Sequence, residues 1–242
     1  MVRAVAAGLF LALSSAASAF VLSPSTMDFE PVGRGANRNF QLENPSDQPV
    51  AVQVSIVTRQ MDVDGNETYS PADSDFTVYP PQTVLQPRQN QTIRVMWLGK
   101  TKPLKELNYR IVAEQLPVNL SKENKPGAKL NIMLRYLGTI YVVPKGAKSK
   151  VVLDSISQEK AKDDKTRLII TLHNQGNAHA LLRDLKLQLT ADDKTVELPE
   201  SALQGMAAEN VLSQQKRRFV IPCPEGFEGK PVQVKYEFNA PR

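Results

Sequence analysis

Residues 129–144 have the sequence Lys-Leu-Asn-Ile-Met-Leu-Arg-Tyr-Leu-Gly-Thr-Ile-Tyr-Val-Val-Pro, and this stretch decides how the rest of the chain is interpreted. In its first half Leu130, Ile132 and Leu134 occupy every second position, so an extended backbone places three aliphatic side chains on one face of a strand. The second half is apolar up to Pro144, which ends the strand because it has no N–H to donate. The pattern predicts a strand that lies half in a core and half available to a partner.

The segment before this strand, residues 119–128, is polar and rich in turn-forming residues. Such a loop leaves the first half of the strand free to contact something other than its own core. We therefore expect a binding edge at this place in the chain.

Short runs of alternating or β-branched residues recur about every ten residues along the chain, separated by turn signals. Residues 50–59 are one example, with valine or isoleucine at positions 50, 52, 54 and 56, and residues 92–98 are another. Hardly any segment has helical spacing over three turns. The pattern predicts an all-β protein built from sandwiches of antiparallel strands.

The first nineteen residues have the pattern of a secretory signal peptide. Arg3 precedes a short apolar run, and the small residues Ala17-Ser18-Ala19 form a cleavage site. The run is too short to cross a bilayer, and no later stretch is apolar enough to do so. We expect a soluble, exported mature chain that begins at Phe20.

About 220 residues remain after cleavage, which suits two domains of ordinary size. Six or seven strands are expected before Pro144, enough for a complete sandwich in residues 20–144. Residues 145–150, Lys-Gly-Ala-Lys-Ser-Lys, have the composition of a linker or hinge. A second, smaller β-sandwich is expected in residues 145–242.

The charge and cysteine content exclude several classes of protein. The formal net charge is +5, and the basic residues are scattered, with Lys216-Arg217-Arg218 as the one run of three. A nucleic-acid-binding surface would be denser and interleaved with aromatic residues. Cys223 is the single cysteine, so no disulfide can form within the chain, and its flanking prolines indicate a strand end or turn.

No motif in the sequence indicates catalysis, a cofactor or a metal. Asp62-Val63-Asp64-Gly65-Asn66 lacks the spacing of a calcium loop and predicts a hairpin turn at Asp64-Gly65. His173 and His179 flank a turn with too few neighbouring ligands for zinc. Nucleophile elbows, phosphate loops and dinucleotide fingerprints do not occur, so we expect a protein that is not an enzyme.

With the strands assigned in this way, the chain resembles the PapD-like periplasmic chaperones of the chaperone–usher pathway. The resemblance rests first on Asn-Tyr-Arg-Ile-Val-Ala-Glu-Gln-Leu-Pro at 108–117, with the polar loop and the alternating strand that follow it. It rests also on the block Phe-Thr-Val-Tyr-Pro-Pro at 76–81 with Gln-Thr-Ile-Arg-Val at 91–95, and on the turn that begins at Asn174. It covers essentially residues 20–242. The motifs Tyr109 to Val112 and Gly138 to Ile140 resemble the divergent alternate, or Ecp-like, members.

This resemblance implies two immunoglobulin-like sandwiches in an L-shaped arrangement and a periplasmic chaperone of pilus or fimbrial subunits. The last strand of the first domain would complete a subunit that lacks its own final strand, with Leu130, Ile132 and Leu134 filling the subunit's groove. An outer-membrane usher would receive the subunit. The resemblance implies no cofactor and no metal.

The basic residues that typically anchor the subunit's C-terminal carboxylate are absent at the matching positions, which hold Thr26 and Thr139. Their hydroxyls can donate hydrogen bonds, and Arg110 or Arg135 can supply the positive charge. Solvated positions on strand faces are the alternative for both arginines. Val143 replaces an arginine of the family's interdomain salt bridge, whose acidic partner would be Glu106.

Two other functions stay open at this stage. An immunoglobulin-like surface adhesin or fibre component would carry an N-terminal donor extension and a disulfide, and a secreted hydrolase would need a catalytic triad; neither set of features is present in the sequence. The sequence leaves undecided which subunit is bound and whether the free protein forms a self-capping dimer through its exposed strand.

Overall fold

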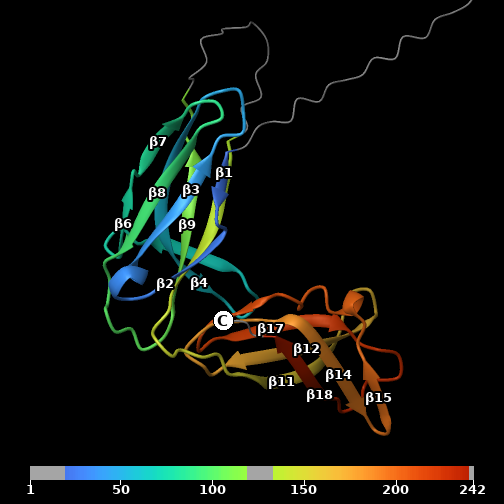
Figure 1. Ribbon diagram of the computed structural model, residues 1–242. Helices are drawn as coiled ribbons and strands as arrows, with labels where there is room; N and C mark the ends of the chain where they lie inside the picture. Colours follow the sequence, from blue (N-terminus) through green and yellow to red (C-terminus); the bar gives the residue numbers. More distant parts are fainter. Residues whose placement is uncertain (1–19, 119–132, 240–242) are drawn as a thin grey trace, which may run out of the picture.

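The computed structural model describes residues 20–118 and 133–239. Its strands form two β-sandwiches that meet at an angle in an L-shaped molecule (Figure 1). The predicted all-β, two-sandwich architecture is confirmed. The predicted signal peptide and two of the three aliphatic residues of the binding strand, Leu130 and Ile132, lie outside the described residues.

Within the described residues, the first sandwich contains ten strands in two sheets. One sheet has the order β1–β3–β8–β6, and the other has the order β2–β10–β9–β4–β5, with β7 also paired to β4. The strands are β1 (Val21–Ser23), β2 (Thr26–Phe29), β3 (Asn37–Glu43), β4 (Val50–Met61), β5 (Glu67–Pro71), β6 (Phe76–Tyr79), β7 (Gln82–Leu85), β8 (Asn90–Trp97), β9 (Leu107–Gln115) and β10 (Arg135–Val142). A short 3-10 helix, η1 (Gly33–Ala36), precedes β3.

The strand count exceeds the six or seven expected from the sequence, partly because the N-terminal segment divides between the two sheets. β1 pairs antiparallel with β3, whereas β2 pairs parallel with β10. Pro24 lies between them after a cis peptide bond. The polar residues of β5, which the alternation rule passed over, add another strand beside β4.

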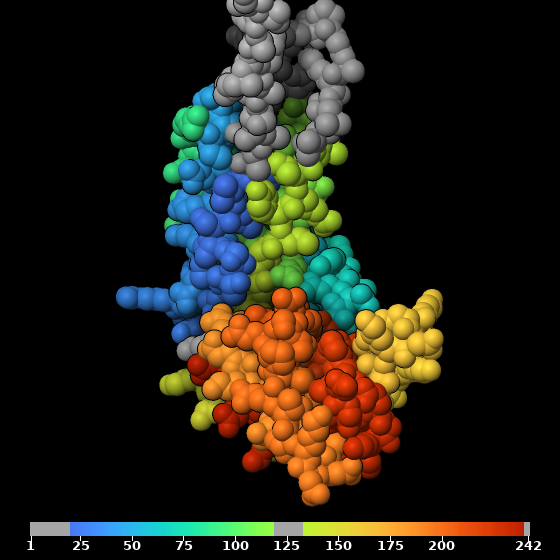
Figure 2. Space-filling model, turned by 90° about the vertical axis from the view of Figure 1, so that its right-hand side faces the viewer, coloured from blue at the N-terminus to red at the C-terminus, as the bar shows by residue number. Residues whose placement is uncertain are grey.

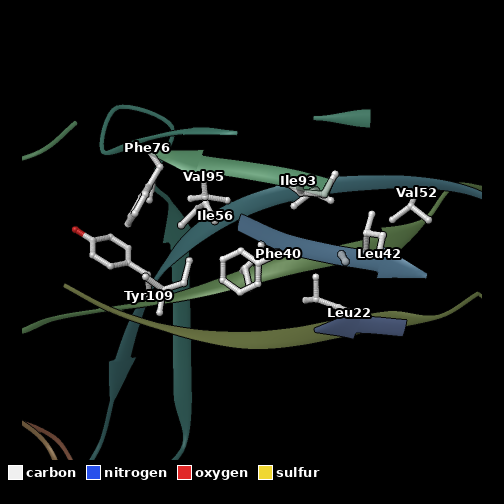
Figure 3. Close-up of a cluster of buried hydrophobic side chains, with 14 of the residues drawn as sticks. Leu22, Phe40, Leu42, Val52, Ile56, Phe76, Ile93, Val95 and Tyr109 are labelled. Atoms are coloured by element: carbon white, nitrogen blue, oxygen red, sulfur yellow. The ribbon is translucent and has the colours of Figure 1, made fainter. Parts of the chain in front are cut away.

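The first core lies between these two sheets and is closed by aliphatic and aromatic side chains from both (Figure 3). The expected alternation on β4 is confirmed, since Val52, Val54 and Ile56 are buried there. Phe76, Trp97 and Tyr109 stack edge to face at one end of this core. Burial of each large side chain stabilises the fold by about 1.5 to 3 kcal/mol.

The second sandwich encloses a separate core, which includes Ile170, Leu187 and Phe227. Its sheets have the orders β11–β12–β17 and β15–β14–β18, with the short pair β13–β16 beside them. The strands are β11 (Val151–Lys160), β12 (Thr166–Asn174), β13 (Ala180–Leu181), β14 (Arg183–Ala191), β15 (Lys194–Glu197), β16 (Asn210–Val211), β17 (Lys216–Pro222) and β18 (Gln233–Asn239). The 3-10 helix η2 (Glu200–Ala202) follows β15.

A buried asparagine, Asn174, ties the start of the second sandwich to the linker. Its amide donates hydrogen bonds to the carbonyls of Ala178 and Val211, at 2.7 and 2.9 Å. Its side-chain oxygen accepts from the N–H groups of Lys150 and Gly176, both at 3.0 Å. These four bonds fix the turn after β12 beside the chain that leaves the first sandwich.

Candidate functional site: an open strand edge above an interdomain cleft

The first part of the candidate site is an unpaired backbone edge on β10. This strand pairs with β9 over its whole length, from Arg135 opposite Glu114 to Val142 opposite Leu107. On its other side it pairs with β2 only from Thr139 onward. Among the described strands, none pairs with residues 135–138 on that side.

The direction of the backbone groups at this edge follows from one hydrogen bond. The Thr139 N–H donates to the Ser25 carbonyl at 2.8 Å, toward β2. Backbone groups two residues apart in a strand point the same way, so the N–H and C=O groups of Leu137 and Arg135 also face this side. They are the groups that an added strand could pair with.

Gly138 explains how the N-terminal strands can approach β10 just below this open edge. A Cβ atom at this position would lie 2.6 Å from Cγ2 of Ile111 and 3.4 Å from both Leu22 and the Ser25 carbonyl. Those distances leave no room for a side chain beside Ile111. Glycine therefore permits the crossing from β1 to β2 to pack against β10.

Leu134 is the one described member of the predicted aliphatic set, and it lies at the start of the open edge. Its side chain is half-buried against the first core, and its carbonyl accepts a hydrogen bond from Gln115 N–H at 2.9 Å. Met133 and Leu137 are exposed, by 59% and 43%. Neither residue was predicted from the sequence as a binding residue, although both occupy positions that alternate with Leu130, Ile132 and Leu134.

The second part of the candidate site is a cleft between the two sandwiches, with a volume of about 760 Å³. Figure 2 views the molecule with the first sandwich standing on the second. Side chains from both sandwiches line the cleft. Both predicted threonines are among them, and they lie directly opposite each other, Thr26 on β2 and Thr139 on β10.

Arg110 joins the two threonines in one row across three strands. It lies opposite Thr139 in the antiparallel β9–β10 pair. Its Nη1 donates a hydrogen bond to the Thr139 hydroxyl. Three of the four predicted anchor residues are therefore gathered at one end of the cleft.

Arg135 lies apart from these three. It is exposed and lies opposite Glu114, four residues before Thr139 on β10. At about 3.3 Å per residue, this separation corresponds to about 13 Å along the strand. Arg135 does not line the cleft, and its role as an anchor stays a prediction.

Glu67 on β5 holds Arg110 and a second arginine, Arg59 on β4. Arg110 donates from Nε to Oε2 at 2.9 Å and from Nη2 to Oε1 at 2.6 Å, and Arg59 donates from Nε to Oε1 at 2.9 Å. Burial raises the pKa of the Glu67 carboxyl, but hydrogen bonds from Arg110, Arg59 and Tyr69 outweigh it and lower the pKa to about 2. Both arginines therefore have a permanently charged partner at neutral pH.

Arg59, which is 8% exposed in the cleft, was not predicted from the sequence as a site residue. The alternation of β4 places position 59 on the outer face of the sheet, away from the core of the first sandwich. The sequence could therefore have indicated that this arginine is available to a site on that face. Its distance from Arg110 depends on the β4–β9 register, and Val57 lies opposite Arg110 there. That register is not encoded in either segment alone.

Tyr141 on β10 links Arg59 to the second sandwich. Its hydroxyl accepts hydrogen bonds from Arg59 Nη1 at 3.4 Å and from Asn210 Nδ2 at 2.6 Å. Its ring stacks on the imidazole of His179, with the ring centroids 3.8 Å apart and an angle of 9° between the planes. One aromatic side chain therefore contacts groups from both sandwiches.

Glu106, predicted as the acidic partner of the family's interdomain salt bridge, contacts the second sandwich. Its carboxylate is buried, and both oxygens lie 2.9 Å from Nδ1 of His179 in the second sandwich. The N–H of His179 donates to Oε1 at 3.2 Å, and Glu106 N–H donates to the Asn177 carbonyl at 2.9 Å. The acidic side of an interdomain pair is therefore present, with a histidine as its partner.

A second contact between the sandwiches comes from the hairpin turn between β4 and β5. This turn, predicted at Asp64-Gly65, is confirmed. Asp64 accepts two hydrogen bonds of 2.6 Å from Arg218 on β17, and Arg218 N–H donates to the Val63 carbonyl at 2.7 Å. In Figure 2 the cyan part of the first sandwich lies next to the red and yellow parts of the second.

Comparison with known proteins decides the family. Residues 20–148 match the model of the pili and flagellar-assembly chaperones, PapD N-terminal domain. The chain belongs to this PapD chaperone family. A search of curated proteins gave no match.

Solved structures show the same fold as this PapD-family chain. A chain of the CsuC–CsuE chaperone–tip adhesion subunit complex from archaic Csu pili of Acinetobacter baumannii has a TM-score of 0.60 at 18% identity, covering 90% of this chain and 98% of that one. The class 5 fimbriae chaperone CfaA has a TM-score of 0.56 at 15% identity, covering 91% and 100%. A chain of the Salmonella enterica complex of SafA pilin with the SafB chaperone has 0.54 at 17%, covering 93% and 99%.

Two further findings concern only the described parts of this PapD-family chain. None of their helices combines the length and the hydropathy needed to cross a bilayer. Within the same residues, histidine, cysteine, aspartate and glutamate side chains do not gather in threes around a possible metal site.

Proposed function

We propose that this chain is a periplasmic chaperone that binds pilus or fimbrial subunits by donor-strand complementation and delivers them to an outer-membrane usher. The observation that carries the proposal is the edge of β10 at residues 135–138, where the described strands supply a backbone partner on one side only. A subunit that lacks its last strand needs such an edge. In this proposal the chaperone's strand supplies the missing hydrogen bonds, with no cofactor.

The apolar part of the interaction is assigned to Leu130, Ile132 and Leu134. Three aliphatic side chains that become buried in the subunit's groove would each favour binding by about 1.5 to 3 kcal/mol. The half-buried Leu134 beside the open edge supports this assignment. The exposed Met133 and Leu137 extend the apolar surface at the same place.

The cleft is proposed to hold the subunit's C-terminal carboxylate. Arg110 would supply the charge, the hydroxyls of Thr26 and Thr139 would donate hydrogen bonds, and Arg59 would add a second positive charge nearby. Glu67 keeps both guanidinium groups in position. Arg135 stays a candidate from the sequence, with a smaller expected effect because it lies outside the cleft.

Coexpression tests the central proposal. The chain and candidate fimbrial subunits are produced together in the periplasm, and we expect a soluble one-to-one complex that Ile132→Asp abolishes. Val220→Asp, at an exposed position on β17 of the second sandwich, is the matched control and should retain the complex. If Ile132→Asp retains binding and pilus assembly, the donor-strand assignment is wrong. A surface adhesin, the alternative function, would form no such complex.

The free protein tests whether the open edge also pairs with a second copy. Size-exclusion chromatography with light scattering would detect a self-capping dimer, and addition of a subunit should convert it to the one-to-one complex. A dimer that Ile132→Asp leaves intact would have to use another surface.

A further inference from the structure

Arg217 on β17 carries a buried guanidinium group whose capacity for hydrogen bonds is largely unused. The residue is 9% exposed and lines the wall of the cleft that belongs to the second sandwich. A guanidinium group has five N–H donors. Among the described residues Arg217 makes one side-chain hydrogen bond, from Nη2 to Glu209 at 3.1 Å, and its buried Nε has no partner. A buried charge with so few bonds is costly unless a further acceptor binds it.

Asn210 on β16 has an unused polar atom on the same wall. It is 8% exposed, and its Nδ2 donates to the Tyr141 hydroxyl at 2.6 Å. Its buried Oδ1 has no hydrogen-bond partner among the described residues. The wall therefore offers a charged donor and a neutral acceptor. A peptide can satisfy both, with a side-chain carboxylate for the donor and a backbone N–H for the acceptor, whereas a sulfate ion supplies acceptors alone.

The charge on this wall favours an anionic group. Arg183 and Arg217 face the cleft with one carboxylate, Glu209, which already bonds Arg217. The other carboxylates that line the cleft come from the first sandwich and are Asp28, Glu67 and Glu106. The wall from the second sandwich thus has two guanidinium groups and one carboxylate, an excess of positive charge.

The β4–β5 turn places Arg217 near the candidate carboxylate anchor. An added Cβ on Gly65 would overlap the guanidinium group of Arg217, so this group lies against the turn. Glu67, two residues further along the hairpin, bonds Arg110. Two residues of extended chain span about 7 Å. The two arginines therefore meet the hairpin at points spaced like every second side chain of an extended peptide.

We infer that this wall recognises an acidic side chain among the last three residues of the subunit, with Arg217 as the specificity-determining residue. The Arg217 guanidinium binds the side-chain carboxylate, Arg183 adds positive charge, and Asn210 Oδ1 accepts a backbone N–H of the same segment. The subunit's end is then held from both sandwiches, with its terminal carboxylate at Arg110. That the ligand is a subunit rests on the proposed function, whereas the preference for an acidic peptide end is a property of the free protein.

Short peptides added to the free protein test this inference. Acetyl-Asp-Gly-Gly and acetyl-Asn-Gly-Gly have the same free C-terminus and differ only in the acidic side chain two residues before it. The arginine Nε–H resonances of isotope-labelled protein are followed during each titration, and the Arg217 resonance is assigned by its absence from Arg217→Lys. We expect the aspartate peptide to shift this resonance and to bind at least about fivefold more tightly than the asparagine peptide.

Three variants separate Arg217 from the other charges. Arg217→Gln should reduce the preference for the aspartate peptide to less than about twofold, with the affinity for the asparagine peptide unchanged. Arg217→Lys keeps the buried charge in case the glutamine variant fails to fold, and it should retain part of the preference. Arg167→Gln is the matched control, because Arg167 pairs with Asp163 and does not line the cleft, and it should bind both peptides as the parent does.

Equal affinities of the parent for the two peptides, no binding of either up to about 10 mM, or a preference that persists in Arg217→Gln would overturn the inference. Sulfate that binds Arg217 as tightly as the aspartate peptide does would also overturn it, because the wall would then hold any anion. If a subunit complex forms in the coexpression test alongside any of these results, the inference alone is wrong. If the peptide preference is found and no subunit complex forms, the proposed function alone is wrong.

Discussion

Arg110 on β9 and Glu67 on β5 meet side by side across the intervening strand β4. Two hydrogen bonds join them, at 2.9 Å from Nε and 2.6 Å from Nη2, and Arg59 on β4 donates to the same carboxylate. Two guanidinium groups that would otherwise repel each other are thus held together by one carboxylate on the wall of the cleft. The arrangement leaves Arg110 Nη1 free to contact Thr139.

Replacing Glu67 with glutamine should destabilise the protein by about 2 to 3 kcal/mol at pH 7, because both arginines lose their charged partner. The pKa of Glu67 is lowered from 4.5 to about 2, so its stabilising effect is complete above about pH 4.5 and disappears as the pH falls through 2. Urea unfolding of the parent and Glu67→Gln at about pH 7 and about pH 2.5 measures the difference, which should shrink at the lower pH.

Glu114→Gln is the matched control for this experiment, since Glu114 is exposed on β9 and lies opposite Arg135. Its free energy of unfolding should change by less than about 0.5 kcal/mol at either pH. An equal loss of stability in both variants would contradict the assigned role of Glu67.

Replacing Thr139 with valine should weaken subunit binding by about tenfold, because it removes a hydroxyl from the proposed carboxylate site and conserves the shape of the side chain. Arg135→Gln should change the affinity by less than about twofold, since that residue is exposed and lies outside the cleft. Titration of each purified variant with a subunit released from its parent complex gives both affinities. If Arg135→Gln weakens subunit binding more than Thr139→Val does, the carboxylate site lies near Arg135 and not in the cleft.

Part of this arrangement followed from the family resemblance and part from local sequence patterns. The positions of the family's basic anchors, counted from Phe29 and from Pro144, selected Thr26 and Thr139, and these residues lie opposite each other in the β2–β10 pair. The alternation of residues 50–56 predicted the inward face of β4. Such patterns succeed because burial on one face of a strand fixes which side chains point inward.

The missed contacts all depend on which distant segments become neighbours. Glu67 lies on a polar strand without apolar alternation, so neither its strand nor its two arginine partners could be predicted from residues 67–71. His179 and Glu106 are 73 positions apart and belong to different sandwiches. Their contact depends on the angle between the sandwiches, which no local pattern encodes.

Replacing Leu137 with proline should weaken subunit binding by at least about tenfold and leave the free protein folded. Leu137 N–H points away from β9 toward the open edge, so its loss removes no bond of the β9–β10 ladder, and proline is tolerated at such edge positions. Circular dichroism and thermal unfolding check the fold, and coexpression with a subunit checks the complex.

Leu137→Thr separates the backbone from the side chain in this test. Threonine keeps the N–H and removes most of the apolar surface, so this variant should retain the complex better than Leu137→Pro does. If the two variants bind a subunit equally well, backbone pairing at residue 137 does not contribute to binding.

Replacing Gly65 with alanine should lower the stability of the protein and loosen the contact of the β4–β5 turn with the second sandwich. Gly65 has a φ of 89°, and an added Cβ would overlap the guanidinium group of Arg217. Backbone strain alone costs about 1 to 2 kcal/mol, and displacement of Arg217 adds to it.

Gly33→Ala is the matched control, because Gly33 has a φ of 74° and an added Cβ would meet no atom within 4 Å. Thermal unfolding should therefore show a larger loss for Gly65→Ala than for Gly33→Ala. Equal losses of thermal stability would mean that each substitution strains only its own turn. The position of the Arg217 side chain would then not require glycine at position 65.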